Sequence, residues 1–181
     1  LAHAQWESGR LKDAVATLEQ GLTAGAPGHE LRLRLGIYLA DSGIDPGRAV
    51  ALLDTMSRSD AEVLNALGVA FLAAGRPDDA TRTFRDVLAL DATNGLAYQN
   101  LAALQLRQAQ AATSPEARRS ALNEAISLAR QALQADPAMA IAFTTLGVAQ
   151  AESGVKNDAI ESWKRAVALD ASEFDALYNL T

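Results

Sequence analysis

Residues 64–84 read LNALGVAFLAAGRPDDATRTF, and they contain two helical patterns separated by a Gly-Arg-Pro turn. In the first pattern Leu67 is followed directly by the small residue Gly68, within a run of good helix formers. In the second pattern Ala80 and Phe84 lie four residues apart, which places them on one stripe of a helix. Glycine commonly ends a helix and proline commonly begins one. The segment therefore predicts a hairpin of two helices.

The same pattern recurs along the whole chain. A leucine followed by a small residue returns after 34, 32, 34, 45 and 34 residues, at Leu1, Leu35, Leu67, Leu101, Leu146 and Leu180. A second series follows in the other half of each repeat, at Ala14, Ala49, Ala80, Ala125 and Ala159. Four of the turns contain a glycine for which we expect the left-handed backbone that ends a helix: Gly9, Gly43, Gly75 and Gly154. Two series that keep one register indicate stacked helical hairpins.

This pattern resembles the tetratricopeptide repeat family, in which a bulky residue, Leu-Gly, an aromatic residue, and then Ala and Phe recur at these spacings. The best match is formed by Leu64, Leu67, Gly68, Phe71, Ala80 and Phe84, and the next by Phe143, Leu146, Gly147, Ala159, Trp163 and Ala166. The unit around Leu35 is weaker, because Arg32 stands where a bulky apolar residue is usual. The small residue after each leucine lets the two helices of a pair approach closely.

The resemblance implies an all-α fold, a right-handed superhelical solenoid of antiparallel helix pairs. We expect a single array over residues 1–181. Its parts are a partial unit 1–28, full units 29–60, 61–94, 95–139 and 140–173, and a partial first helix 174–181. Neither end offers a polar cap, so we expect an ordered part of a longer array whose bare ends could pair in a homodimer.

One unit is longer than the others, with 11 extra residues between Leu101 and Ala125. Ser114 is the expected N-cap of a new helix and Pro115 its first residue. Shared equally between two antiparallel helices, the extra residues would lengthen each by roughly 8 Å. The insertion is either drift in a tolerant loop or a docking edge that carries Arg107, Arg118 and Arg119.

The composition argues against several classes of site. There is no Cys, and the two histidines, His3 and His29, fall in different units without a carboxylate cluster nearby in the sequence. No glycine-rich phosphate loop and no Gly-x-Ser-x-Gly sequence is present. We therefore expect no catalytic residue, no metal and no cofactor. A net charge of -6 argues against nucleic acid as a partner, and no apolar run is long enough for a membrane span.

The resemblance also implies where a partner binds, because in this family the first helix of each hairpin lines the concave side of the superhelix. The inward positions lie two residues and one residue before each leucine of the first series, and two and five residues after it. The candidate groove residues are Leu33, Arg34, Ile37, Asn65, Val69, Leu72, Gln99, Asn100, Ala103, Leu106, Thr144, Thr145, Val148 and Tyr178. They predict an apolar floor with amide and hydroxyl groups along one side, which fits an apolar helix or an extended peptide. Alternatively, the small apolar residues only tighten the curvature.

The resulting functional hypothesis is a non-catalytic scaffold that binds a peptide segment or a partner helix. The alternative is a tetratricopeptide appendage of a larger enzyme, of glycosyltransferase or sulfatase type, that selects substrate proteins. The abundance of Ala, and of Arg relative to Lys, suggests a bacterial source. The compartment stays open between cytoplasm and periplasm, with the cytoplasm preferred.

Overall fold

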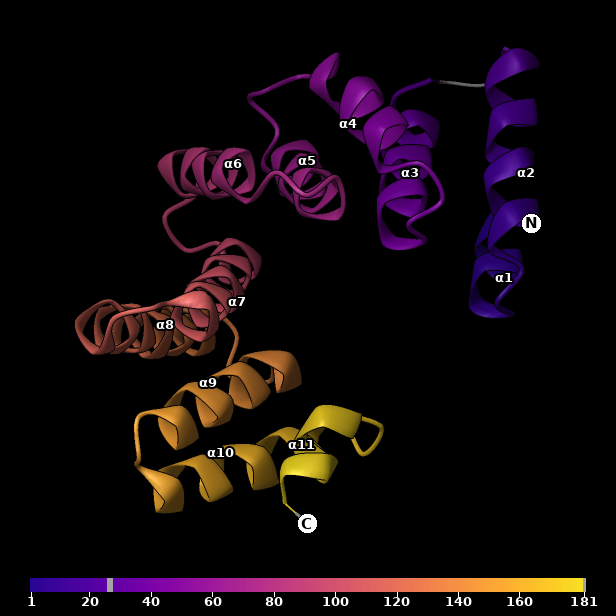
Figure 1. Ribbon diagram of the computed structural model, residues 1–181. Coiled ribbons are helices and arrows are strands. Elements are labelled where there is room, and N and C mark those ends of the chain that lie inside the picture. Colours follow the sequence, from indigo (N-terminus) through magenta and orange to yellow (C-terminus); the bar gives the residue numbers. More distant parts are fainter. Residues whose placement is uncertain (26–27, 181) are drawn as a thin grey trace. The chain divides into compact units, whose positions relative to one another are not determined.

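The protein is described by a computed structural model that covers residues 1–25 and 28–180, and this part of the chain is built from helices without a strand (Figure 1). The predicted all-α class is confirmed. The helices of the N-terminal half are α1 (Ala2–Glu7), α2 (Leu11–Thr23), α3 (Gly28–Asp41), α4 (Pro46–Asp54), α5 (Ala61–Ala73) and α6 (Pro77–Leu90). Those of the C-terminal half are α7 (Gly95–Ala111), α8 (Pro115–Ala135), α9 (Ala140–Glu152), α10 (Lys156–Leu169) and α11 (Phe174–Asn179).

The helices form two compact units, unit 1 over Leu1–Leu90 and unit 2 over Asp91–Thr181. In unit 1 the hairpins α1–α2, α3–α4 and α5–α6 form, and α3 packs on both α2 and α5. In unit 2 the hairpins α7–α8 and α9–α10 form, α9 packs on α7 and α8, and α11 packs on α10. Each unit therefore has the repeated hairpin order that the sequence predicts, while the boundary after Leu90 falls inside the expected unit 61–94.

The turns between paired helices follow the sequence signals closely. Gly75 has φ +72° and Gly154 has φ +87°, and Gly9 and Gly43 also have positive φ. The left-handed backbone predicted for these four glycines is confirmed. Side chains other than glycine are strained in this region, which explains why a glycine stands at the end of these first helices.

The core of each hairpin depends on a small residue in the first helix. A Cβ atom at Gly147 would overlap the Trp163 ring, and one at Gly36 would overlap the Leu53 side chain. The expected close approach of the paired helices is therefore confirmed. It leaves bulky residues of the second helices, such as Leu53 and Trp163, almost fully buried.

The 11-residue insertion lengthens both helices of the first hairpin of unit 2. Helix α7 has 17 residues against 13 in α9, and α8 has 21 against 14 in α10. The added length is thus larger in α8 than in α7, which corrects the expectation of an equal division. The predicted start of α8 is confirmed, because the Ser114 hydroxyl accepts a hydrogen bond of 3.1 Å from the Ala117 N–H and Pro115 is the first helical residue.

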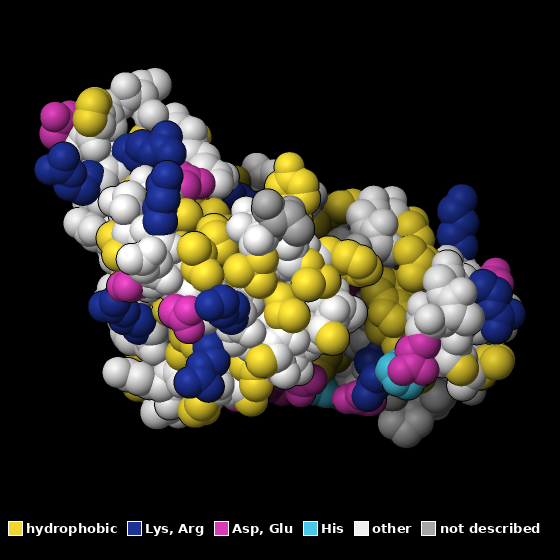
Figure 2. Space-filling model, turned by 90° about the horizontal axis from the view of Figure 1, so that it is seen from below, with side chains coloured by type: hydrophobic (Ala, Val, Ile, Leu, Met, Phe, Trp, Pro, Cys, Tyr) yellow, Lys and Arg dark blue, Asp and Glu magenta, His cyan; other side chains and the backbone are white. Residues whose placement is uncertain are grey.

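The last helix leaves apolar side chains on the surface of unit 2. Phe174 is 78% exposed and Tyr178 is 81% exposed, and Leu177 is also exposed. Figure 2 looks onto this unit from the side of α10 and α11 and shows hydrophobic side chains gathered around the end of α11.

Among the helices of the described residues, none combines the length and the apolar character that crossing a membrane requires.

Candidate functional site

The candidate groove residues lie on the first helix of each hairpin, as their spacing requires. The first-helix face of unit 1 is the surface that these residues form on α3 and α5. It includes the adjoining residues His3 and Trp6 of α1. The corresponding surface of α7, α9 and α11 is the first-helix face of unit 2. Each face belongs to its own unit and is built from the helices of that unit alone.

In unit 1, residues from three successive first helices meet at one pocket of about 210 Å³. Helix α1 contributes His3 and Trp6, helix α5 contributes Glu62, and the remaining walls belong to α3. The candidate residues brought together here are Leu33, Arg34 and Ile37. Leu33 is almost fully buried, so its side chain supports the floor, whereas Ile37 stays partly exposed.

An aromatic pair forms one wall of this pocket. The rings of Trp6 and Tyr38 are stacked with their centroids 4.1 Å apart and their planes inclined by 14°. The Tyr38 hydroxyl lies 3.4 Å from Nδ1 of His3, which adds a polar contact between α1 and α3. Sequence reasoning did not select Tyr38, because its spacing from Leu35 matches none of the inward positions. Contact with Trp6 across the hairpins is what brings it to the pocket.

The rim of the unit 1 pocket carries both signs of charge. Arg34 Nε donates to Glu30 Oε1 at 2.5 Å, and this hydrogen bond, with the attraction between the charges, raises the pKa of Arg34. Asp41 also lines the pocket, and partial desolvation by the surrounding protein raises the pKa of its carboxyl although the residue keeps contact with solvent. Arg34 is therefore engaged within its own helix, while its stem remains available to pack against a bound segment.

The rest of the unit 1 face belongs to α5. Asn65, Val69 and Leu72 are each partly buried, so they offer limited apolar and amide surface. Val69 and Leu72 are three residues apart and lie on the same side of the helix.

In unit 2 the polar candidate residues form hydrogen bonds within the protein. Gln99 Nε2 of α7 donates a hydrogen bond of 2.8 Å to Thr145 Oγ1 of α9, and the Thr145 hydroxyl in turn donates to the Ile141 carbonyl at 3.0 Å. The Thr144 hydroxyl donates to the Ala140 carbonyl at 3.3 Å. Gln99 is only 5% exposed, and both threonines are buried as well. The expectation of an open amide and hydroxyl side is therefore corrected here, because these groups join the two first helices.

The accessible part of the unit 2 face is largely apolar. Ala103, Leu106 and Val148 are partly exposed, as is Asn100, and Tyr178 of α11 projects well into solvent. Val148 packs against the cluster formed by Ala159, Trp163 and other buried residues, so its position is held by the core.

The histidines each lie near one carboxylate. His3 Nε2 is 3.2 Å from Glu7 Oε1, and His29 Nε2 is 3.9 Å from Asp60 Oδ2. Within residues 1–25 and 28–180, no group of three or more His, Cys, Asp or Glu side chains is arranged to hold a metal ion. The two first-helix faces thus carry aromatic, aliphatic and charged side chains.

Comparison with known proteins supports the repeat assignment. A family model of the tetratricopeptide repeat matches residues 63–116. No curated protein sequence is similar to this chain at a significant level. The structure is similar to the crystal structure of MamA, with 19% identity, 96% of each chain covered and a TM-score of 0.65.

Two further solved structures have the same fold. TTC0263, a thermophilic TPR protein of Thermus thermophilus, is 24% identical, with 83% of this chain and 80% of that chain covered and a TM-score of 0.75. The first TPR of Spaghetti (RPAP3), bound to the HSP90 peptide SRMEEVD, is 19% identical, with 69% and 90% covered and a TM-score of 0.58. At these identities the similarity establishes the fold.

Proposed function

This chain is a tetratricopeptide repeat protein, and we propose that it is a non-catalytic scaffold that binds a peptide segment or a helix of a partner protein on its first-helix faces. The observation that carries the proposal is the unit 1 pocket, where Trp6, Ile37 and Glu62 from three successive first helices border one cavity. A surface assembled from several repeats can follow an extended ligand from one hairpin to the next.

The side chains of the two faces support a partner with apolar residues. Trp6 and Ile37 in unit 1, and Leu106 and Val148 in unit 2, are all partly exposed on first helices. Aromatic and aliphatic anchors of this kind supply most of the free energy in peptide recognition, because their burial removes apolar surface from water. The peptide-bound TPR of RPAP3 adds support, since a related fold binds a peptide there.

The proposal is tested by placing one charge on each face. We suggest the double variant Val69→Asp with Val148→Asp, because both valines are partly exposed and lie on α5 and α9. A partner recovered by affinity capture should lose at least about tenfold in affinity when a carboxylate faces its apolar side chains.

A matched control carries the same substitutions on second helices. Val50→Asp with Val167→Asp changes two partly buried valines on α4 and α10, one in each unit. Val167 packs against the same core cluster as Val148, so the control bears a comparable folding cost. Circular dichroism verifies that both proteins are folded. The proposal is wrong if the partner binds the first double variant as tightly as it binds the control.

A further inference from the structure

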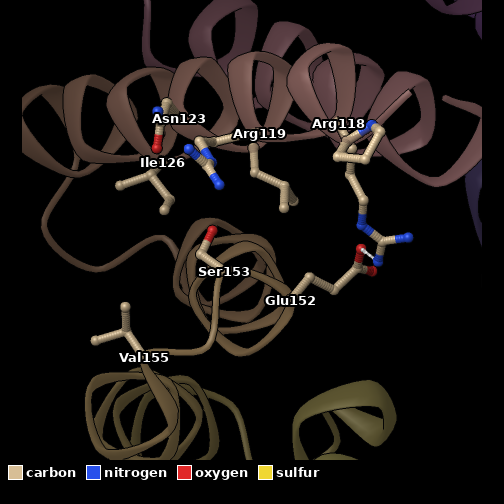
Figure 3. A pocket seen from close by; sticks show the side chains of 9 residues that line it. Arg118, Arg119, Asn123, Ile126, Glu152, Ser153 and Val155 are labelled. Atoms are coloured by element: carbon tan, nitrogen blue, oxygen red, sulfur yellow. Dashed lines mark hydrogen bonds and ion pairs between the residues drawn. The ribbon is translucent and has the colours of Figure 1, made fainter. Parts of the chain in front are cut away.

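A second pocket, distinct from the first-helix faces, lies in unit 2 between the first half of α8 and the turn that joins α9 to α10. Its volume is about 480 Å³. Helix α8 supplies one wall, and the segment from Glu152 to Val155 supplies the other (Figure 3). A volume of this size accommodates one or two side chains of a bound segment but not the width of a whole helix.

The pocket walls are braced by contacts that involve the lengthened helices. Glu152 accepts hydrogen bonds of 2.8 Å from Gln110 of α7 and from Arg118 of α8, so the extended hairpin is tied to the end of α9. Beneath the pocket, Leu122 is buried and belongs to one core cluster with Ala149 of α9. The lengthened hairpin is therefore fixed to α9 by hydrogen bonds and by core packing.

The two arginines of the pocket have different surroundings. Arg118 is paired with Glu152 at 2.8 Å. Arg119 makes no hydrogen bond or ion pair with any other residue that the structure describes. Figure 3 shows its side chain directed from α8 toward the space over Ser153, on the side of Ile126, while Arg118 turns toward Glu152. The donors of the Arg119 guanidinium thus face the pocket without a partner.

Apolar side chains lie beside this free guanidinium. Leu122 and Ile126 line the α8 wall, and Val155 on the opposite wall is 45% exposed. Two guanidinium groups and one carboxylate leave the lining with a net charge of +1, in a chain whose net charge is -6. The lining therefore combines one unpaired positive charge with apolar surface.

We propose that this pocket binds an extended segment of a partner protein in which a carboxylate side chain stands next to an apolar one. The carboxylate pairs with the Arg119 guanidinium, whose planar donors match two carboxylate oxygens. The neighbouring apolar side chain packs on Ile126 and Val155. A single negative charge matches the net charge of +1 of the lining, whereas a phosphate dianion exceeds it and is repelled more strongly by Glu152 than a carboxylate is.

The test uses short peptides of defined sequence, because the natural segment is not identified. The probe is acetyl-Gly-Ser-Glu-Leu-Ser-Gly-amide, titrated into the ¹⁵N-labelled full chain and followed by NMR. We expect saturable shifts in the amide signals of Arg119, Ile126, Ser153 and Val155. The same peptide with Gln in place of Glu should bind at least about tenfold more weakly, because it lacks the charge-assisted hydrogen bonds.

The matched pair of variants is Arg119→Gln and Arg130→Gln. Both arginines are exposed residues of α8 without an ion pair among the described residues, but Arg130 lies outside the pocket. Arg119→Gln should weaken binding of the Glu peptide at least about tenfold, and Arg130→Gln should leave it unchanged. Val155→Ser, which removes exposed apolar surface, should weaken binding several-fold.

Three results would overturn the proposal. The first is the absence of shifts at the pocket, and the second is equal binding by the Arg119→Gln and Arg130→Gln variants. The third is binding as tight as that of the Glu-Leu peptide by either of two other probes. These are the same peptide with phosphoserine in place of Glu, and sodium acetate alone. The outcome is distinguishable from that of the first-helix faces, because neither Val69 nor Val148 lines this pocket.

Discussion

Gly68 and Phe84 meet across the α5–α6 hairpin at such close range that a Cβ atom on the glycine would overlap the phenylalanine ring. Phe84 is fully buried at this contact. In the hairpin α7–α8 the corresponding residues are Ala102 and Ala129, which belong to one buried cluster. Where the first helix has alanine in place of glycine, the second helix thus has alanine in place of phenylalanine. The distance between the paired helices therefore depends on the combined size of the two facing side chains.

The first prediction concerns Gly68→Ala. The new methyl group would be forced against the Phe84 ring, and overpacking of this kind costs about 1–3 kcal/mol. The better helix propensity of alanine offsets up to about 1 kcal/mol of that cost. We therefore expect a net loss of stability, measured as a lower midpoint of urea denaturation followed by circular dichroism.

Gly47→Ala is the matched control, because the nearest atom to a Cβ there is Asp45 Oδ1 at 3.8 Å. It should be neutral or slightly stabilising. Adding Phe84→Leu to Gly68→Ala should make the double variant more stable than the sum of the two single losses predicts. Strict additivity would show that the two side chains do not compete for one space.

The second prediction concerns Trp163, which is buried against Gly147. Trp163→Ala should reduce the free energy of unfolding by about 3–5 kcal/mol, because it leaves a large cavity. Trp163→Phe should cost much less, since it keeps an aromatic ring and removes an indole N–H that is buried without a hydrogen-bond partner in the described residues. An unchanged denaturation midpoint for the alanine variant would contradict its place in the core.

The third prediction concerns the buried hydrogen bond between Gln99 and Thr145. Thr145→Val leaves the Gln99 amide without this acceptor and should cost about 1–3 kcal/mol. Adding Gln99→Met should recover most of the loss, because both polar groups are then replaced by apolar ones. Thr144→Val is the control, as the Thr144 hydroxyl bonds only to the carbonyl of its own helix in the described contacts. A double variant less stable than Thr145→Val would refute the pairing.

The fourth prediction concerns pH. Desolvation raises the pKa of Asp41 above its ordinary value of 3.8, so the folded state holds this proton more strongly than the unfolded state does. Ionised Asp41 therefore destabilises the fold at neutral pH, and the penalty fades as the pH falls through the raised pKa toward 3.8. Asp41→Asn should be more stable than the wild type at pH 7, with the difference disappearing as the pH falls to about 3.5 in urea titrations.

Ionisation of Asp79 has the opposite effect on stability to ionisation of Asp41. Hydrogen bonds from Arg76 and Arg82 lower the pKa of its carboxyl, so its ionised form favours the folded state. Asp79→Asn should accordingly lower stability at pH 7, and the loss should shrink as the pH falls below 3.8. Two variants that responded to pH in the same direction would contradict these assignments.

The fifth prediction concerns the brace of the lengthened hairpin. Glu152→Ala removes the acceptor of both Gln110 and Arg118, so the first turns of α8 should open more often. Hydrogen exchange should become faster over residues 115–122 and stay unchanged over α5. Arg130→Ala is the control, since Arg130 makes no ion pair among the described residues. Identical exchange in the two variants would remove Glu152 from this role.

Features set by short-range spacing could be predicted from the sequence. The left-handed Gly75 and the N-cap Ser114 follow from turn and capping chemistry, which acts over a few residues. The close approach at Gly147 follows from the repeat register. These are local rules, and the structure satisfies them.

Features that depend on neighbouring hairpins could not be predicted. Spacing places Gln99 and Thr145 on an inward face, but only the packing of α7 on α9 shows that they hydrogen-bond to each other. The stacking of Tyr38 on Trp6 could not be predicted for the same reason, because it depends on contact between α1 and α3. For the same reason a repeat pattern does not reveal the division after Leu90.

The stacked indole of α1 has a practical consequence. The chain contains two tryptophans, and Trp6 belongs to unit 1 while Trp163 belongs to unit 2. Replacing Trp6 by phenylalanine leaves indole emission from the C-terminal unit alone. Comparing the intrinsic fluorescence of this variant with its circular dichroism during heating then reveals whether the two halves melt together or one after the other, without any added dye.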